Sequence, residues 1–372
     1  MRKLIESVFD ITGDDQDIKI FMDRSKFIEQ YMNEDEISRY ESSNWVLDSE
    51  NVEGIFSHWN GRKMDLGGVR FSPDLNKKSV SPISVEDMFY DCPNLEELNL
   101  RDWDVSKTKN FEKMCCGCDS LRCVDFLEWV GRPKSTSCMF SRCKKLGEVN
   151  LPESFSLERV NDVSHMFFGC KNLRKVTLGD PNHPCKMKRL YSFCMFSGCS
   201  ELEEIDLRGL VGDDIRDISS FSSNIASFGS MFARCSKLKK ILGTLNLFVE
   251  NYNPSKIFCG CNSLEDVKIH FLIEKQHNYY LKLALNDLIS LNRNSIEFIA
   301  KNIDKIPTVP RTLRGAGCVI FYGPMLSKYG ENFEKKICGL LNKKNWALAM
   351  CEKGNESYPK STYSKFNFKN IP

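Results

Sequence analysis

The chain has 372 residues, of which 41% are hydrophobic and 27% charged, and it contains 22 Gly and 13 Pro. These proportions exclude collagen-like, disordered and low-complexity chains. The formal net charge of +2 argues against a nucleic-acid binder that relies on bulk attraction to phosphate, and no apolar run approaches the ~18 residues of a membrane span.

The N-terminal segment is acidic. Residues 1–50 hold 6 Lys and Arg against 13 Asp and Glu, whereas residues 271–372 hold 16 against 8. The opposite charge of the two ends is typical of a solvated surface and would also suit head-to-tail self-assembly. Apolar residues at helical spacing predict an acidic helical cap over residues 1–51: Leu4, Val8, Ile11, Ile20, Phe21, Phe27, Ile28 and Tyr31. The start has no apolar signal-peptide stretch, so we expect a cytoplasmic or virion-associated protein.

One internal repeat dominates the chain between residues 52 and 270. The segment Met88–Leu100 has the pattern Met-Phe-x-x-Cys-x-x-Leu-x-x-Leu-x-Leu, and related segments start at 114, 139, 166, 195, 231 and 257. A worn copy at residues 55–66 is one residue short and lacks the Cys. Terminal repeats of stacked structures are often atypical, so this copy is expected to be a cap.

Each repeat combines two periodicities. From Phe through Cys to the first Leu the apolar steps are three and three, which predicts a short helix or 3₁₀ turn with one inward face. Leu98 and Leu100 then alternate with Glu97 and Asn99, as in a short strand with one buried face. Neither element can bury its apolar face alone, so the repeats are expected to stack.

The repeat takes up seven of the 17 cysteines. A small, weakly polar thiol can be buried at the end of a turn at little cost, which we prefer as the explanation. The clusters at Cys115, Cys116, Cys118 and at Cys259, Cys261 do not have the paired spacing of zinc ligands, so structural thiols are favoured and no metal is expected. Disulfides between stacked repeats are conceivable but need an oxidising compartment.

The repeat pattern resembles the BspA-like leucine-rich repeats of bacterial, mycoplasma and protozoan surface proteins. The resemblance covers about residues 52–270, including the linkers at Arg101–Ser106 and Val160–Phe167. It implies an α/β repeat fold, a right-handed leucine-rich-repeat solenoid with a parallel sheet on its concave side. For function it implies binding, since relatives are described mostly as adhesins or surface antigens.

Two longer linkers, around residues 179–184 and 209–224, are candidate recognition loops, although drift in tolerated surface loops explains them equally well. After Ile269 the repeat stops. Residues 271–372 are predicted to form a basic α/β C-terminal cap. The predicted elements are a helix that starts at Asn294–Glu297, a strand at Gly317–Tyr322, a helix over residues 324–342 and a strand at Trp346–Met350.

Catalytic signatures are missing from the sequence. It contains no phosphate-binding glycine loop, no Gly-x-Ser-x-Gly and no His-Glu-x-x-His, and its five His fall at unrelated repeat positions. We therefore predict a protein without enzymatic activity or cofactor. The alternative of an enzyme housed in residues 271–372 would need a deep polar pocket there.

The strand positions that face away from the core are the predicted binding surface. They lean acidic in the first five repeats, which favours a protein partner with a basic surface and no nucleic acid. Solvated strand positions with no ligand explain any single residue equally well. A phage-associated or surface-associated structural component or adhesin, assembling with itself or with virion components, is the alternative function. The candidate residues are Glu97, Asn99, Asp125, Glu148, Asn150, Thr177, Glu204 and Asp206.

Overall fold

The computed structural model describes most of the repeats and much of the C-terminal region. The described residues are 9–12, 19–22, 46–47, 53–54, 56–65, 70–71, 83–101, 105, 108–126, 129, 131–152, 154–178, 192–211, 230–248, 257–272, 281–285, 288–303, 317–343, 346–351 and 367–368. The chain divides into two compact units, Met1–Asp180 and Pro181–Pro372.

Strands occupy the described part of the acidic N-terminal segment. β1 (Phe9–Thr12) pairs antiparallel with β2 (Lys19–Met22), so the prediction of helices is wrong at these residues. Apolar and polar side chains alternate along β1, and its aromatic and β-branched residues favour extended backbone. Other residues that supported a helix lie outside the described residues: Leu4, Val8, Phe27, Ile28 and Tyr31.

Short parallel strands follow the first Leu of each repeat, as the alternating pattern predicted. In the first unit β4 (Lys63–Asp65), β7 (Glu97–Asn99) and β9 (Cys123–Asp125) form one sheet, and β10 (Glu148–Asn150) pairs with β11 (Lys175–Thr177). In β7, β10 and β11 the middle residue is buried and the first is exposed. The worn copy contributes β4 and is therefore part of the same stack.

Two short pairs of parallel strands and a 3₁₀ helix also belong to the described part of the first unit. β3 (Val46–Leu47) pairs with β5 (Arg70–Phe71), and β6 (Ile83–Ser84) pairs with β8 (Thr108–Asn110), both in parallel. Single parallel bridges continue the β6 and β8 side from Asn110 to Ser135 and from Ser135 to Asp162. A 3₁₀ helix, η2, covers Leu157–Arg159.

The apolar segment around each Met-Phe-x-x-Cys is a chain of tight turns and not the short helix that was one of the predictions. Alternate residues donate backbone hydrogen bonds to the next repeat: the N–H groups of Asp87, Phe89 and Asp91 bond to carbonyls of residues 112, 114 and 116 at 3.1, 2.7 and 2.7 Å. The intervening N–H groups of Met88 and Tyr90 bond three residues back within the turn. The turns therefore form a second hydrogen-bonded stack besides the strands.

Positive φ angles mark the same two places in each of these turns. In the first clear repeat they are Asp87 (φ 56°) and Asp91 (φ 53°), and the worn copy has them at Gly54 (φ 62°) and His58 (φ 60°). An α-helix does not tolerate such residues, so they explain why the apolar spacing of three gives turns. Equivalent residues in later repeats include Lys113, Gly117, Cys138, Arg142, His165, Gly169, Cys194, Gly198, Ser230, Arg234 and Gly260.

The buried Cys joins each repeat to the one before it. The Sγ of Cys170 donates to the backbone carbonyl of Phe140 at 2.9 Å, and that carbonyl also accepts from the N–H of Cys143. The same thiol contact to the Phe position of the preceding repeat recurs at 2.9–3.1 Å for Cys92, Cys118, Cys143, Cys235 and Cys261. Each of these side chains is fully buried, which confirms the inward assignment of the Cys.

Stacked Phe rings fill the core beside these thiols. Phe140 stacks on Phe167 with ring centroids 5.7 Å apart, and the rings of Phe196, Phe232 and Phe258 stack in the second unit at 5.6 and 5.8 Å. Such parallel stacking follows from the repeat, because the same side chain recurs on neighbouring turns. All five rings are at most 2% exposed.

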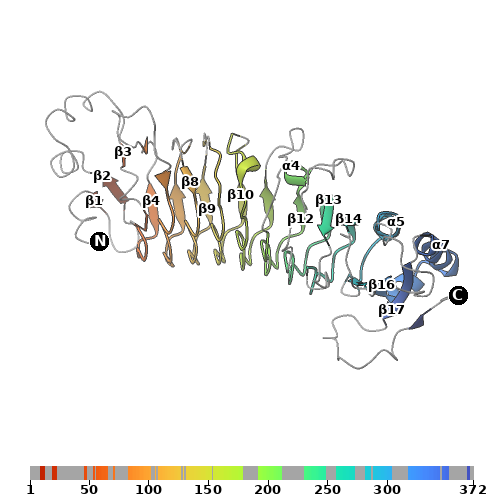
Figure 1. Cartoon of the computed structure of the whole chain (residues 1–372). Coiled ribbons are helices and arrows are strands. Elements are labelled where there is room, and N and C mark those ends of the chain that lie inside the picture. Colours follow the sequence, from red (N-terminus) through yellow and green to blue (C-terminus); the bar gives the residue numbers. More distant parts are fainter. Residues whose placement is uncertain are drawn as a thin grey trace. The chain divides into compact units, whose positions relative to one another are not determined.

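The second unit contains β12 (Glu204–Asp206), α4 (Arg208–Val211), β13 (Lys240–Phe248) and β14 (Asp266–Leu272). β12, β13 and β14 pair in parallel, and β13 and β14 lie side by side in Figure 1. The predicted loop at 209–224 is described only as far as residue 211, and the linker at 179–184 lies outside the described residues.

Helix α5 (Arg293–Lys301) continues the second unit and contacts β14. Its N-cap is Asn292, whose side chain accepts from the N–H of Ser295, so the helix starts earlier than predicted. The buried hydroxyl of Ser295 accepts from the N–H of Val267 and donates to the carbonyl of Glu265. In this way Ser295 links the helix to the last repeat.

A four-stranded sheet ends the chain, in the order β15 (Leu281–Leu285), β16 (Gly317–Tyr322), β17 (Trp346–Cys351) and β18 (Asn367–Phe368). The first three strands are parallel and β18 is antiparallel. The two predicted strands are confirmed as β16 and β17, whereas β15 and β18 were not predicted.

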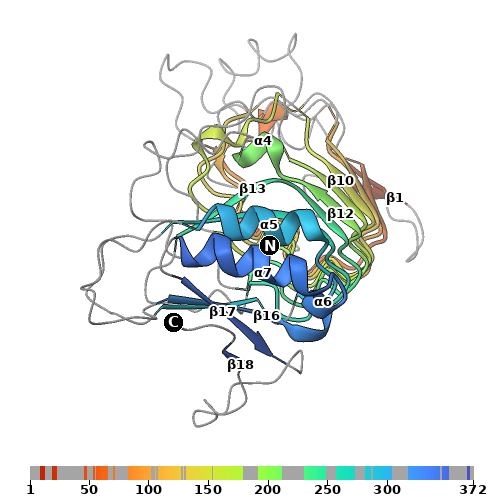
Figure 2. The same cartoon turned by 90° about the vertical axis from the view of Figure 1, so that its right-hand side faces the viewer.

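The predicted helix over residues 324–342 is in fact two helices, α6 (Gly323–Ser327) and α7 (Glu331–Asn342). Gly330 separates them with φ 82°, a conformation that glycine adopts readily and that ends a helix. α5 and α7 contact each other and lie side by side in Figure 2.

We predict that Cys170→Asp destabilises the protein by about 3–5 kcal/mol, because it buries a charge with no partner and removes the thiol contact to Phe140. The same change at exposed Cys123 is expected to cost less than about 1 kcal/mol. Urea unfolding of both variants checks this, and equal losses would contradict the role of the buried thiol.

Candidate functional site

The eight predicted site residues all lie on strands with their side chains exposed or half-buried, as expected. Six belong to the first unit, where Asn99 lies beside Asp125 and Asn150 lies beside Thr177 in strand register. Glu204 and Asp206 lie on β12 in the second unit. We call this outward set of strand positions the strand face.

Cations or neutral residues flank the predicted glutamates of the first unit. Glu97 lies in register between Lys63 and Cys123, and its carboxylate is 3.5 Å from the Lys63 ammonium. Glu148 lies beside Lys175. Glu97 and Glu148 therefore have no carboxylate directly beside them on the paired strands, because the parallel register places Lys63, Cys123 and Lys175 there.

The aspartates are also paired. Asp125 lies 3.4 Å from the guanidinium of Arg101, and Asp206 lies 2.7 Å from that of Arg208. The hydrogen bonds from Arg208 hold the pKa of Asp206 below its usual value. Two amide-type contacts complete the predicted set: Thr177 donates to the side chain of Asn150 at 3.1 Å, and Asn99 accepts from the N–H of Arg101 at 3.0 Å.

A second row of charged residues runs along the edge of the strand face. The residue directly after the first Leu is charged in six of the seven clear repeats. Each described member donates its N–H to the carbonyl of the previous member, at 2.7–3.5 Å. We call this row the edge column; in the first unit it is Arg62, Glu96, Arg122, Gly147 and Arg174, and in the second unit Glu203, Lys239 and Glu265.

Charges alternate along the edge column and pair with one another. The carboxylate of Glu96 accepts from Nε and Nη2 of Arg62 at 3.2 and 3.0 Å, and lies 3.7 Å from the guanidinium of Arg122. The hydrogen bond from Arg62 is the main reason that the pKa of Glu96 is lowered. In the second unit Lys239 pairs with Glu203 at 3.3 Å. None of these residues was among the predicted site residues, although their charge pattern is visible in the repeats.

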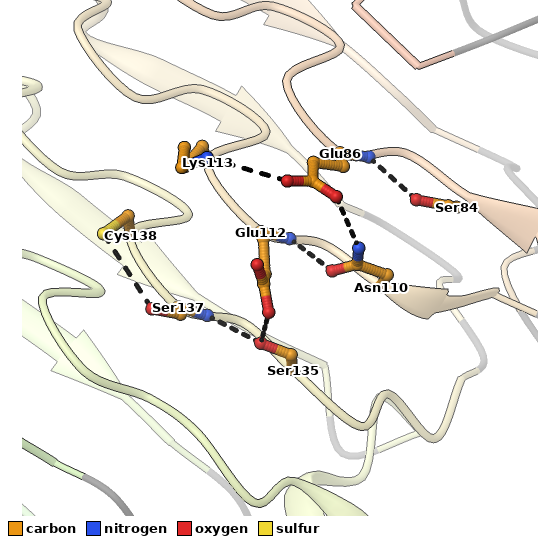
Figure 3. A network of polar contacts seen from close by, with 8 residues as sticks. All are labelled: Ser84, Glu86, Asn110, Glu112, Lys113, Ser135, Ser137 and Cys138. Atoms are coloured by element: carbon orange, nitrogen blue, oxygen red, sulfur yellow. Dashed lines mark hydrogen bonds and ion pairs between the residues drawn. The ribbon is translucent and has the colours of Figure 1, made fainter.

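A separate polar network lies on the β6 and β8 side of the first unit (Figure 3). The side chains of Ser84, Asn110 and Ser135 each accept from the N–H two residues ahead. Asn110 then donates to Glu86 of the previous repeat at 2.9 Å, and Ser135 donates to Glu112 at 2.7 Å. These hydrogen bonds join the linkers of neighbouring repeats and use most of the polar side-chain groups in the network.

Burial makes several of the described thiols poor nucleophiles. Burial raises the pKa of the Cys115 and Cys143 thiols well above the ordinary value and that of Cys235 to about 12. Within the residues that the structure describes, no group of three or more His, Cys, Asp or Glu is arranged to hold a metal ion. None of the helices in the described ranges has the length and apolar character needed to cross a bilayer.

We expect Glu96→Gln to lower the thermal midpoint at pH 7, because both arginines beside it lose their charged partner. The folded pKa of Glu96 lies below the ordinary value of 4.5 for a glutamate. Its ionised form therefore stabilises the fold above about pH 4.5, and this contribution is lost as the pH falls through the folded pKa. The difference in thermal midpoint between wild type and variant should therefore decrease progressively below pH 4.5. A difference that does not change with pH would contradict the pairing.

Comparisons with known proteins match the repeat region of the chain to leucine-rich repeats. Residues 134–303 match the BspA-type leucine-rich repeat region, in six copies, and residues 50–180 match the family described as a Mycoplasma protein of unknown function, DUF285. The comparison with curated proteins gave no match.

Two solved structures are similar to this chain. A leucine-rich repeat protein from Bacteroides ovatus is 16% identical, with 88% of this chain and 95% of that chain covered and a TM-score of 0.24. An internalin from Listeria monocytogenes is 13% identical, with 79% and 85% covered and a TM-score of 0.24. The repeat pattern and the parallel strands agree with this family match, so residues 134–303 of the chain are similar to the BspA-type leucine-rich repeat region.

Proposed function

We propose that the chain is a non-enzymatic scaffold that binds another protein through its strand face. The observation that carries this proposal is the repeated burial pattern of β7, β10, β11 and β12, in which the middle side chain is buried and the first is exposed. Adjacent strands lie ~4.8 Å apart, so outward side chains recur at a fixed spacing on a backbone whose hydrogen bonds are already made. Such a surface can vary residue by residue without disturbing the core.

The shape of the scaffold follows from the same repeat. We propose that residues 52–270 stack as a right-handed solenoid with the strands on its concave side, and that residues 271–372 cap its last repeat. The contacts of Ser295 with β14 support the capping role, because they satisfy backbone groups at the end of the stack.

The chemistry of the described residues supports binding more than catalysis. Glu97, Asp125 and Asp206 of the strand face are paired with cations, and the buried thiol of Cys170 is hydrogen-bonded to the backbone. A leucine-rich repeat surface of this kind acts by complementarity of shape and charge.

Site-specific photo-cross-linking in the native host tests the proposal. A photoreactive residue at Glu148 or Lys175, both exposed on the strand face, should capture the same protein, identified by mass spectrometry. Exposed Arg142, on the turn side of the third repeat, is the matched control and should capture none of it. Capture at Arg142 alone, or at none of the three positions, would contradict the proposal.

A further inference from the structure

The edge column of the first unit lacks one carboxylate. Its members alternate in charge from Arg62 through Glu96 to Arg122, and Arg174 continues the row as a cation. The position between Arg122 and Arg174, where the alternation calls for an acid, is Gly147. In the second unit the acidic and basic members follow one another without a gap, from Glu203 through Lys239 to Glu265.

Neither backbone strain nor packing requires glycine at this position. Gly147 is not among the described residues with a positive φ, so an L side chain suits its backbone. A Cβ added there would meet no heavy atom within 4 Å. The gap is therefore open space on the surface between two arginine side chains.

The cations beside the gap are in excess. Within the described part of the chain no carboxylate oxygen lies within 4 Å of the side-chain nitrogens of Lys145, Arg174 or Lys175, although the charge of Lys145 helps to lower the pKa of Glu96. Arg122 is 60% exposed, and its contact with Glu96, at 3.7 Å, is longer than the 3.0 Å contact that Arg62 makes. By contrast, Glu96, Glu97, Asp119 and Asp125 on the first two clear repeats all have a cation within 4 Å.

We propose that a carboxylate from an acidic segment of a protein partner occupies the gap at Gly147, between Arg122 and Arg174. The inference rests on the proposed function and adds the partner's chemistry. An acidic segment replaces the basic partner surface expected from the sequence, because Glu97, Asp125 and Asp206 already have cations beside them. The two arginines lie two strand spacings apart, roughly 10 Å, and their long side chains can reach one carboxylate between them. The partner thus supplies the acid that the edge column lacks.

A single carboxylate suits this gap better than a dense polyanion does. Glu148 is exposed directly beside Gly147, and Asp119 lies on the neighbouring repeat in contact with Lys144. These acids would repel the closely spaced charges of a nucleic acid or a sulfated glycan. A polypeptide can space its acids to avoid them, so the partner is an acidic peptide segment.

The first experiment measures binding of a fluorescein-labelled peptide with Glu at alternate positions to the full chain, by fluorescence anisotropy. Replacing Lys145, Arg174 and Lys175 together with Gln should weaken binding by about ten-fold or more. The control replaces Lys237, Lys239 and Lys240 with Gln. These residues occupy the same repeat positions, and Lys237 and Lys239 are already paired with Glu201 and Glu203. The control removes the same charge, so it should change binding by less than about two-fold.

The second experiment fills the gap from within the chain. Gly147→Glu should abolish peptide binding and raise the thermal midpoint, because the new carboxylate pairs with the arginines. Gly147→Gln has nearly the same size without the charge and should keep binding within about three-fold of wild type.

Three results would overturn the inference: an equal loss of peptide affinity in the two triple variants, an equal loss of affinity in Gly147→Glu and Gly147→Gln, or no binding of the peptide to the wild type. So would heparin or single-stranded RNA that binds more tightly than the peptide and shows the same dependence on Arg174. The proposed function would survive any of these results if cross-linking at Glu148 and Lys175 still captured one protein.

Discussion

The stack depends on hydrogen bonds between the turns of successive repeats. Alternate N–H groups of the turns bond to the next repeat, and in six described repeats the Cys thiol bonds back to a backbone carbonyl at the Phe position of the repeat before. A short strand of three residues provides few hydrogen bonds by itself. The turns therefore supply a second set of contacts, and the positive φ residues are the backbone geometry that makes these contacts possible.

This arrangement separates structure from recognition. The turns and the inward strand positions make the core, so the outward positions of the strand face and edge column can carry charge without disturbing it. Several of these charges neutralise one another between neighbouring repeats, as those of Arg62 and Glu96 do. Where the neutralisation fails, around Gly147 and Arg174, the surface holds an unmet charge that a partner can satisfy.

The sequence predicted the inward Met, Phe, Cys and Leu positions and the strands of the repeats, because their spacing repeats seven times. It left open whether the segment around Met-Phe-x-x-Cys is a short helix or a 3₁₀ turn. Residues as different as Asp87 and Lys113 adopt positive φ there and only some positions are glycine, so the residue types did not decide between the two. The eight predicted site residues lie on strands with exposed or half-buried side chains, as the alternating pattern indicates. Their pairing was missed, because Lys63 belongs to the worn copy, whose missing residue hides its register with Glu97.

Hydrogen exchange of backbone amides tests the central role of the turns most directly. The N–H groups of Phe89, Cys115 and Phe140 each bond to the next repeat at 2.7–2.9 Å, although all three lie in turns. They should exchange as slowly as the buried strand residues Leu98 and Val149, and they should become exposed together with them. Turn amides that exchange as fast as free loops while the strands remain protected would contradict the account.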